Sequence, residues 1–371
     1  MVELLESPGA SVAATRRQAR SLESVPGFRG ETRYASPGSL GDVCVVTYQF
    51  LNDEIVAFVE QGSEVRLVRR LTSRDAFASL MRRLDAQWRR FEDPSLAARQ
   101  QSHILAATQD LLQRLHLALV APLGILDEPG VLFVPVGAIA NVPFGALHDG
   151  TCYLIERMPV AIAPSRRAAE FAAGATRRGR HRLVMGISDE HTRHIHVEAA
   201  SISEVEPEAT VLLDEAAGTA ALLEHAAEHD ILHIASHGIE RPDNPLFGAL
   251  RFSDRWLTAA EITGAALDGQ AIVLSACSSG TQFSAGSEDE LIGLPRAFLA
   301  AGASAVVVNL WQVDDSSAAD LMATFHRELE TASVAVALRS AQIQAMERRP
   351  HPYWWAAATV VGALTDDQEM T

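Results

Sequence analysis

Apolar residues along the chain follow two spacings, one typical of strands and one typical of amphipathic helices. Runs rich in Val and Ile at 43–50, 54–59 and 65–71 predict a strand meander, with a hairpin turn at 51–53. Apolar residues at three- and four-residue steps predict two long helices, roughly 73–91 and 95–118. The first 40 residues are rich in Gly, Pro, Ser and Arg, which predicts a tail or linker, or one helix over 10–24.

Strands and helices alternate along the rest of the chain. We expect strands at 131–135, 153–157, 158–163, 182–187, 210–213, 230–236, 270–276, 303–310 and 353–362, and helices at 198–205, 216–228, 258–264, 291–301, 315–331 and 333–347. This alternation predicts an α/β fold with a mostly parallel sheet flanked by helices on both faces. A Gly- and Arg-rich connector over 173–182 divides the rest of the chain into a first lobe over 41–175 and a second lobe over 176–371, after the tail over 1–40.

Composition excludes several classes of protein. With 31 basic and 47 acidic residues the net charge is −16, which argues against nucleic-acid binding and suits a basic partner or substrate segment. The chain contains no lysine, so neither a Gly-Lys-Ser/Thr phosphate loop nor a pyridoxal Schiff base is possible, and we expect no cofactor. Three widely spaced cysteines fit neither a disulfide framework nor a metal site. No signal peptide or apolar membrane span is present, so we expect a cytoplasmic protein.

Two strand-length runs end at reactive side chains. Ile231–Gly238 delivers His237, and the run from Ala271 delivers Cys277, followed by small residues. Ligands of open α/β sheets bind outside the carboxyl ends of the strands. Neighbouring parallel strands would therefore bring a base and a thiol to one edge of the sheet, as a cysteine nucleophile requires. The backbone N–H groups of Gly238 and Cys277 are the candidate oxyanion hole. The alternative is that Cys277 is a buried core cysteine.

Other chemistry-bearing residues favour structural roles. His233 precedes His237 by four residues but lies in a predicted strand, so we expect it to be buried and hydrogen-bonded. The cluster His181, His191, His194 and His196 has irregular spacing typical of a solvated loop, with zinc binding as the alternative. Trp354 and Trp355 favour packing. Trp311 ends a strand at the same edge as Cys277, which makes it the better candidate for a substrate groove.

Five motifs in order carry a family resemblance. They are His233–Gly238, Leu274–Cys277, Gly293–Ala303, Asn309–Asp315 and His351–Trp354. Together they resemble the CHAT family of bacterial caspase-like proteases, which are often associated with tetratricopeptide repeats and are distant relatives of separase. The segment from Val134 to Leu147 resembles the upstream half of the same family, so the resemblance covers about 43–362.

The resemblance implies a caspase-like fold and a cysteine endopeptidase with a dyad of His237 and Cys277. Ser278 and Ser279 stand where many relatives have an acidic residue and a threonine. Separases also have serines at these positions. The first lobe corresponds to a degenerate caspase-like subdomain. Separase-like relatives read a basic side chain near the Leu-Trp segment. The candidate substrate-binding residues of this chain, in and after the segment Leu310–Trp311, are Trp311, Gln312 in place of the separase aspartate, Asp314 and Asp315. Glu288, in the loop after the cysteine, is a further candidate. Asp is a favoured helix cap, so capping of the helix that starts at residue 316 is the preferred role of Asp315, and the same residue could also bind substrate.

Two functions remain open at this stage. The first is an endopeptidase that cleaves a protein substrate after a basic residue and is regulated by a sensor or repeat protein, in bacterial defence or cell death by family analogy. The second is a catalytically latent, protease-shaped interaction module. The acidic loop over 280–292 is the expected moving part between latent and active forms.

Overall fold

The structure, a computed structural model, describes residues 38–92, 94–175, 179–189, 195–239, 245–277, 293–311 and 315–364. For residues 92, 94–101, 245, 276–277 and 315–316 it describes the backbone only. The predicted tail over 1–40 and the predicted loop over 280–292 thus lie wholly or almost wholly outside the described residues.

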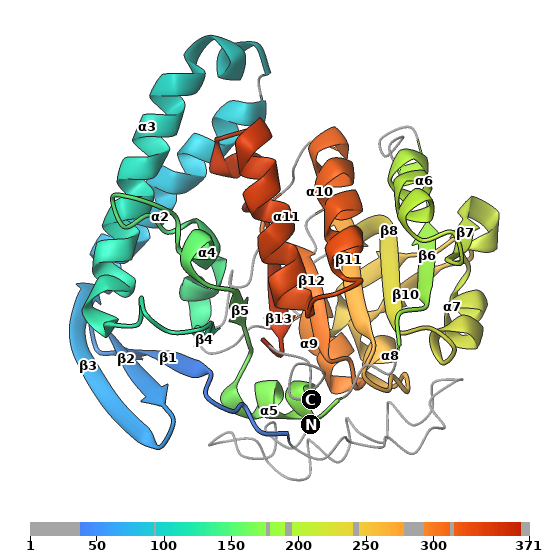
Figure 1. Cartoon of the computed structure of the whole chain (residues 1–371), viewed down its shortest axis with the longest axis horizontal. Helices are drawn as coiled ribbons and strands as arrows, with labels where there is room; N and C mark the ends of the chain where they lie inside the picture. Colours follow the sequence, from blue (N-terminus) through green and yellow to red (C-terminus); the bar gives the residue numbers. More distant parts are fainter. Residues whose placement is uncertain are drawn as a thin grey trace.

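A single mixed sheet organises the described chain (Figure 1). Its strands are β1 (Cys44–Leu51), β2 (Glu54–Gln61), β3 (Glu64–Ser73), β4 (Val131–Val134), β5 (Val160–Ile162), β6 (Arg182–Gly186), β7 (Thr210–Leu213), β8 (Ile231–Ile239), β9 (Ala249–Arg251), β10 (Trp256–Thr258), β11 (Ala271–Cys277), β12 (Ala305–Asn309) and β13 (Ala358–Gly362). They run in the order β10-β9-β8-β11-β12-β13-β5-β4-β1-β2-β3, and β6 and β7 extend from β8.

The sheet consists of two parallel halves that meet at an antiparallel pair. β7, β6, β8, β11 and β12 are parallel neighbours, and so are β13, β5, β4 and β1. β12 and β13 pair antiparallel, so the strands of the two halves point in opposite directions. β13 comes from the end of the chain but pairs with β5, which means that the sheet continues across the predicted boundary between the lobes.

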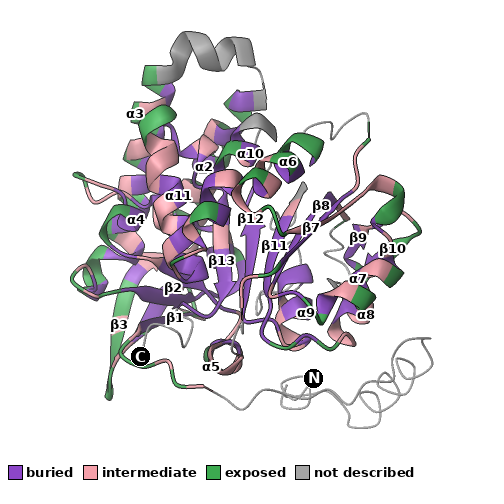
Figure 2. Cartoon of the chain, turned by 45° about the vertical axis from the view of Figure 1, so that its right-hand side comes forward, coloured by how far each residue is buried: buried purple, intermediate pink, exposed green. Residues whose placement is uncertain are grey.

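Helices cover both faces of the sheet (Figures 1 and 2). They are α2 (Arg74–Trp88), α3 (Pro94–Leu119), α4 (Leu154–Arg157), α5 (Arg166–Gly174), α6 (Ile195–Val205), α7 (Thr219–Ala226), α8 (Ala259–Thr263), α9 (Leu294–Ala300), α10 (Asp315–Glu328) and α11 (Val334–Arg348). Figure 2 shows the central strands buried and the outer faces of the helices exposed, as the mostly parallel α/β prediction requires.

Alternation along the central strands explains how both faces become buried. On β11, Ala271 and Val273 belong to one buried cluster with Phe325 of α10. Ile272 and Leu274 belong to the other cluster with Phe298 of α9. Successive strand side chains point to opposite faces, so a strand covered on both sides must be a continuous apolar run. The apolar segment that ends at Cys277 therefore predicts a central strand, and the structure confirms this.

Most predicted elements are present, with boundaries shifted by a few residues. One prediction was wrong: residues 154–157 form the one-turn helix α4, since the Glu156 side chain accepts a hydrogen bond from the Tyr153 N–H and closes the turn. The predicted last strand is also shorter, because a 3₁₀ turn with Pro352 at its start precedes β13. The short strands β9 and β10 and the helix α5 were not predicted.

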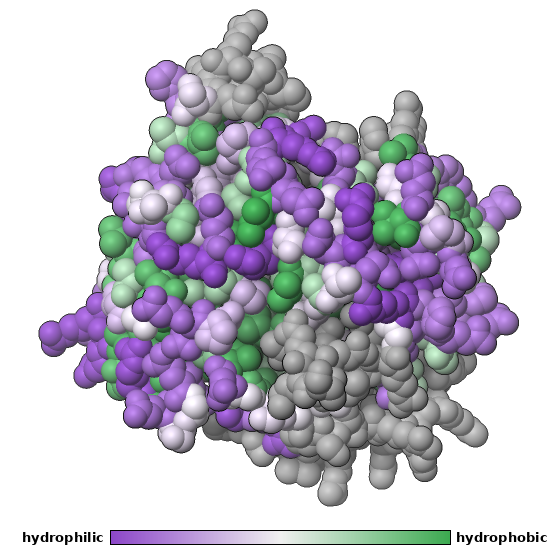
Figure 3. All heavy atoms as spheres, in the orientation of Figure 1, coloured by the Kyte–Doolittle hydropathy of each residue, from purple (hydrophilic) through white to green (hydrophobic). Residues whose placement is uncertain are grey.

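The surface is largely hydrophilic on the face shown in Figure 3, apart from the atoms drawn in grey. Val65 and Leu67 of the edge strand β3, with Phe58 beside them on β2, are among the exposed large apolar residues. None of the helices that the structure describes is long and apolar enough to cross a bilayer.

Candidate active site

His237 and Cys277 occupy paired positions on neighbouring parallel strands. β8 and β11 are in register from Ile231 opposite Ala271 to His237 opposite Cys277. Neighbouring strands of a sheet lie about 4.8 Å apart, and the register places both residues at the carboxyl-terminal edge of their half of the sheet. Of Cys277 the structure describes the backbone. β8 continues past the predicted strand end, so that Gly238 pairs with Leu250 of β9.

The imidazole of His237 is held by a carboxylate from a third strand end. Its Nε2 atom lies 2.7 Å from Oδ2 of Asp189, which follows β6, the other parallel neighbour of β8. The side chain of His237 is 29% exposed, so the ring is open to a substrate while its position is fixed. Because Nε2 contacts Asp189, Nδ1 is the ring nitrogen left for a proton transfer. Sequence reasoning missed Asp189, although its place after an apolar strand was a usable signal.

Asp214 fixes the turn that carries Asp189. Its Oδ1 accepts hydrogen bonds from the backbone N–H of Ser188 at 3.0 Å and from the Ser188 hydroxyl at 2.8 Å. Oδ2 lies 2.8 Å from Nε2 of His196. The N–H of Ser188 above all, with its hydroxyl, holds the pKa of Asp214 below its usual range. Asp214 has a positive φ of 49°, a left-handed backbone conformation that Asp adopts more readily than most other residues.

The other two cysteines are poor nucleophiles. Cys44 is buried in β1, and burial, with the nearby Glu128 carboxylate, raises the pKa of its thiol to about 11. Burial and the neighbouring Asp149 likewise raise the pKa of Cys152. A thiol reacts as the thiolate, so both remain largely unreactive at neutral pH. Cys277 is the cysteine whose place in the fold suits catalysis.

The predicted substrate-binding residues are only partly described. Glu288, Gln312 and Asp314 lie outside the described residues, and of Asp315 the structure describes only the backbone, as the first residue of α10. The indole of Trp311 is buried and stacks on Trp88 with ring centroids 4.7 Å apart. Its Nε1–H donates to the Tyr353 carbonyl at 3.0 Å. This packing supports a structural role for Trp311, and its role in substrate binding stays a prediction.

The histidine assignments can be checked where the rings are described. His233 is fully buried, with Nδ1 3.1 Å from Nε2 of His326, which confirms the prediction of a buried, hydrogen-bonded ring. His181 is exposed, and His196 pairs with Asp214. Among the residues whose side chains are described, no three His, Cys, Asp or Glu side chains gather closely enough to hold a metal ion. Trp355 is fully buried, and Trp354 packs against Phe91, as predicted.

Comparison with known proteins identifies the family. The CHAT domain model matches residues 109–363, which is well over half of the chain. The chain belongs to the CHAT domain family. A curated relative, tetratricopeptide repeat protein 28 of Mus musculus, is 34% identical over 112 residues. That match covers 29% of this chain and 4% of the relative.

The fold of this CHAT domain is that of caspase-like proteases. A crystal structure of the separase–securin complex of Saccharomyces cerevisiae matches with a TM-score of 0.61 at 10% identity, over 95% of this chain and 32% of that chain. The Arg-specific cysteine proteinase gingipain R matches with a TM-score of 0.48 at 10% identity, over 70% of this chain and 67% of that chain. The chain therefore spans a small part of the length of the curated relative and about a third of the separase chain.

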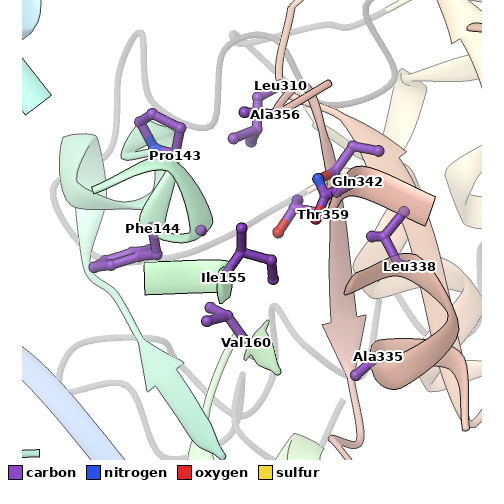
Figure 4. Close-up of a pocket in the computed structure, with 12 residues that line it drawn as sticks. Pro143, Phe144, Ile155, Val160, Leu310, Ala335, Leu338, Gln342, Ala356 and Thr359 are labelled. Atoms are coloured by element: carbon purple, nitrogen blue, oxygen red, sulfur yellow. The ribbon is translucent and has the colours of Figure 1, made fainter. Parts of the chain in front are cut away.

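A cavity of this CHAT domain lies at the junction of the two sheet halves, away from β8 and β11 (Figure 4). Its walls come from β5, α4, α11 and β13, and include Pro143 and Phe144 of the upstream family segment. Arg339 of α11 closes the junction by donating from Nε to the Ile155 carbonyl at 2.8 Å. The lining is mostly apolar, which favours packing between the halves over chemistry.

Proposed function

We propose that this CHAT domain is a cysteine endopeptidase with Cys277 as nucleophile and His237 as general base. The observation that carries the proposal is the register of β8 and β11, which pairs His237 with Cys277 at one strand edge. Membership of the CHAT family and the caspase-like fold support the same reaction class. Asp189 adds a carboxylate partner for the imidazole, as catalytic histidines often have.

The reaction follows from the positions of these groups. Nδ1 of His237 takes the proton of the Cys277 thiol, and the thiolate attacks the carbonyl carbon of the scissile peptide bond. The N–H groups of Gly238 and Cys277 stabilise the oxyanion of the tetrahedral intermediate. The C–N bond then breaks, and the leaving amine takes the proton from His237. Water, deprotonated by His237, hydrolyses the thioester and frees Cys277. Throughout, the carboxylate of Asp189 stabilises the imidazolium at Nε2.

The substrate side is a narrower proposal. We propose cleavage after a basic residue, with Asp314, Asp315 and Glu288 as the acidic groups that recognise it. A carboxylate shielded from water binds a guanidinium through two parallel hydrogen bonds. The net charge of −16 favours approach of a basic peptide segment.

Regulation by a second protein is part of the proposal. The chain matches only a small fraction of a tetratricopeptide repeat protein and about a third of separase, so its relatives carry substantial further domains. We propose a repeat-containing or sensor protein as the activating partner, in bacterial defence or cell death.

The test is active-site labelling combined with peptide cleavage. A peptide library with basic, acidic and apolar residues before the scissile bond is incubated with the chain, with and without candidate activators. A peptidyl electrophile built on the preferred sequence then labels the wild type and C152A but not C277A. C152A is the matched control because Cys152 is a half-buried cysteine just before α4 and belongs to neither β8 nor β11.

Three results contradict this assignment. If C277A cleaves as fast as the wild type, Cys277 is not the nucleophile. If H237A keeps its full rate, His237 is not the base. A wild-type chain that cleaves and labels nothing with any activator favours the alternative, a protease-shaped interaction module.

A further inference from the structure

A chain of buried polar side chains crosses the core beneath His237 and Cys277. Arg182 of β6, His326 of α10 and His233 of β8 are completely buried, and Glu198 of α6 is 5% exposed. The half-buried Ser275 of β11 completes the chain. Burying charged and polar groups costs free energy unless each finds a partner, so such a chain requires a compensating role or full mutual satisfaction.

In the two hydrogen bonds that link Arg182, His326 and His233, the arginine determines which atom donates and which accepts. Arg182 can only donate, and its Nε lies 3.3 Å from Nδ1 of His326, which must therefore accept. Burial, His233 and Arg182 together lower the pKa of His326 well below its usual range, so the ring is neutral with its proton on Nε2. That Nε2–H points at Nδ1 of His233, 3.1 Å away. His233 consequently carries its proton on Nε2.

Glu198 contacts both strands, through an ion-pair contact with His233 that falls short of a hydrogen bond and through a hydrogen bond from Ser275. Nε2 of His233 lies 3.3 Å from its Oε1 atom, and the Ser275 hydroxyl donates to its Oε2 atom at 3.0 Å. His233 precedes His237 by four residues on β8, and Ser275 precedes Cys277 by two residues on β11. At about 3.3 Å of rise per residue, the carboxylate lies within a few residues of the predicted dyad. The buried side chain of Glu198 thus contacts both of the strands that carry His237 and Cys277.

The far end of the chain is anchored in the same way. Arg182 donates to carboxylate oxygens of Glu206 and Glu330, and its Nη2 atom also donates to the backbone carbonyl of His326 at 2.9 Å. Arg182 and Glu198 are therefore the two ends of the chain, with the two imidazoles between them. Because the arginine cannot lose its proton, it fixes the tautomer of both rings and leaves Glu198 as the acceptor at the other end.

We infer that Glu198 is a positioning residue of the proposed peptidase: its carboxylate ties β8 to β11 through His233 and Ser275, and the Arg182–His326 pair fixes the tautomer that makes this tie possible. The kinetic consequence rests on the proposed function, whereas the tautomers do not. A glutamine at this position keeps an oxygen that can accept from Ser275 but carries no charge opposite the His233 ring.

The first measurement is independent of catalysis. Chains labelled with ¹⁵N-histidine are observed by NMR at neutral pH without substrate, and the two rings are assigned with H233Q and H326Q. Both rings should be neutral and protonated on Nε2. E198Q should shift the signals of His233, whereas E204Q should not, because Glu204 is an exposed glutamate on the same helix. An imidazolium, or a ring protonated on Nδ1, at either position would overturn the inference.

The second measurement is the rate of the proposed reaction. E198Q and S275A should each lower kcat by about tenfold with little change in KM, as expected when a hydrogen bond to a charged group is lost. S275T keeps the hydroxyl and should restore most of kcat, and E204Q should match the wild type. Wild-type kcat in both E198Q and S275A overturns the positioning role. If the wild type cleaves no peptide, the proposed function fails separately, and the alkylation rate of Cys277 by iodoacetamide replaces kcat in this comparison.

Discussion

The imidazole of His237 and the carboxylate of Asp189 lie 2.7 Å apart although 48 positions separate them in the chain. Their strands, β6 and β8, are parallel neighbours in register, with Gly186 opposite Ala235. The carboxyl ends of the two strands therefore reach the same edge, and the short turn after β6 carries Asp189 to His237. The same register that pairs His237 with Cys277 on one side supplies the histidine with a carboxylate on the other.

Removing the charge of Asp189 should slow the proposed reaction. D189N keeps the size of the side chain but loses the negative charge that stabilises the imidazolium and orients the ring. We expect kcat to fall by roughly 10- to 100-fold, the range for a hydrogen bond to a charged group, with KM nearly unchanged. Steady-state kinetics on the preferred peptide measure this. D42N, at an exposed aspartate outside the site, is the control. Equal rates for D189N and the wild type would mean that Asp189 does not act on His237.

Asp214 should support activity through the turn that it holds. An asparagine tolerates the positive φ of this position, so D214N tests the carboxylate with little change in backbone strain. We expect a smaller loss of kcat in D214N than in D189N, because Asp214 contacts Ser188 and not His237. In D214A the backbone strain increases and the contacts with Ser188 and His196 are lost, so its thermal midpoint should fall below that of D214N. Calorimetry and kinetics on the two variants distinguish these effects. If D214N and D214A both matched the wild type, Asp214 would not support activity through this turn.

Local sequence patterns were sufficient to predict the central strands that end at His237 and Cys277, whereas the dyad came from the family resemblance and stays a prediction. The runs that end at His237 and Cys277 are apolar on both faces, which is what a strand covered by helices on two sides requires. The rule that ligands of parallel sheets bind at the carboxyl ends of the strands suggested a common edge, and the structure shows that the two strands are neighbours. The family resemblance then gave the order of the motifs.

Contacts between distant segments could not be predicted in this way. Nothing near Glu198 in the sequence indicates that its carboxylate would meet His233 and Ser275, because helix packing decides which strand a helical side chain faces. Predicting the contact of Asp189 with His237 would have required the order of β6 and β8 in the sheet, and local sequence patterns do not determine that order. Residues 154–157 were wrongly predicted as a strand because so short an apolar run does not distinguish a strand from one helical turn.

The stack of Trp88 and Trp311 should contribute mainly to stability. The two rings lie 4.7 Å apart, and Trp311 is buried. Truncation of a buried aromatic ring typically costs about 3–5 kcal/mol, so W311A should lower the free energy of unfolding by an amount in that range. W311F, which keeps a ring against Trp88, should lose less. Urea denaturation gives these values. If W311F unfolds like the wild type but raises KM severalfold, Trp311 contacts substrate, and the earlier expectation of a groove residue is restored.

Acid should destabilise the protein partly through His351. Nδ1 of this buried ring accepts the Tyr353 N–H at 3.1 Å, and Nε2 lies 3.1 Å from the Thr108 hydroxyl, so the ring fits its site in the neutral form. Burial lowers the pKa of His351 from 6.5 to about 4. As pH falls below the unfolded-state value, the unfolded chain takes up a proton that the folded chain refuses, and stability is lost down to the folded-state pKa. The full difference corresponds to about 3 kcal/mol.

Replacing His351 by glutamine should therefore flatten the acid side of the stability profile. H351Q keeps one donor and one acceptor for Thr108 and Tyr353 but does not titrate, so its free energy of unfolding should fall less steeply than that of the wild type between neutral pH and about pH 4.5. Some slope should persist, because burial also lowers the pKa of His326 and His116. Urea unfolding at a series of pH values measures both slopes. An unchanged slope in H351Q would show that His351 takes up its proton equally well in the folded and unfolded chains, contrary to its burial.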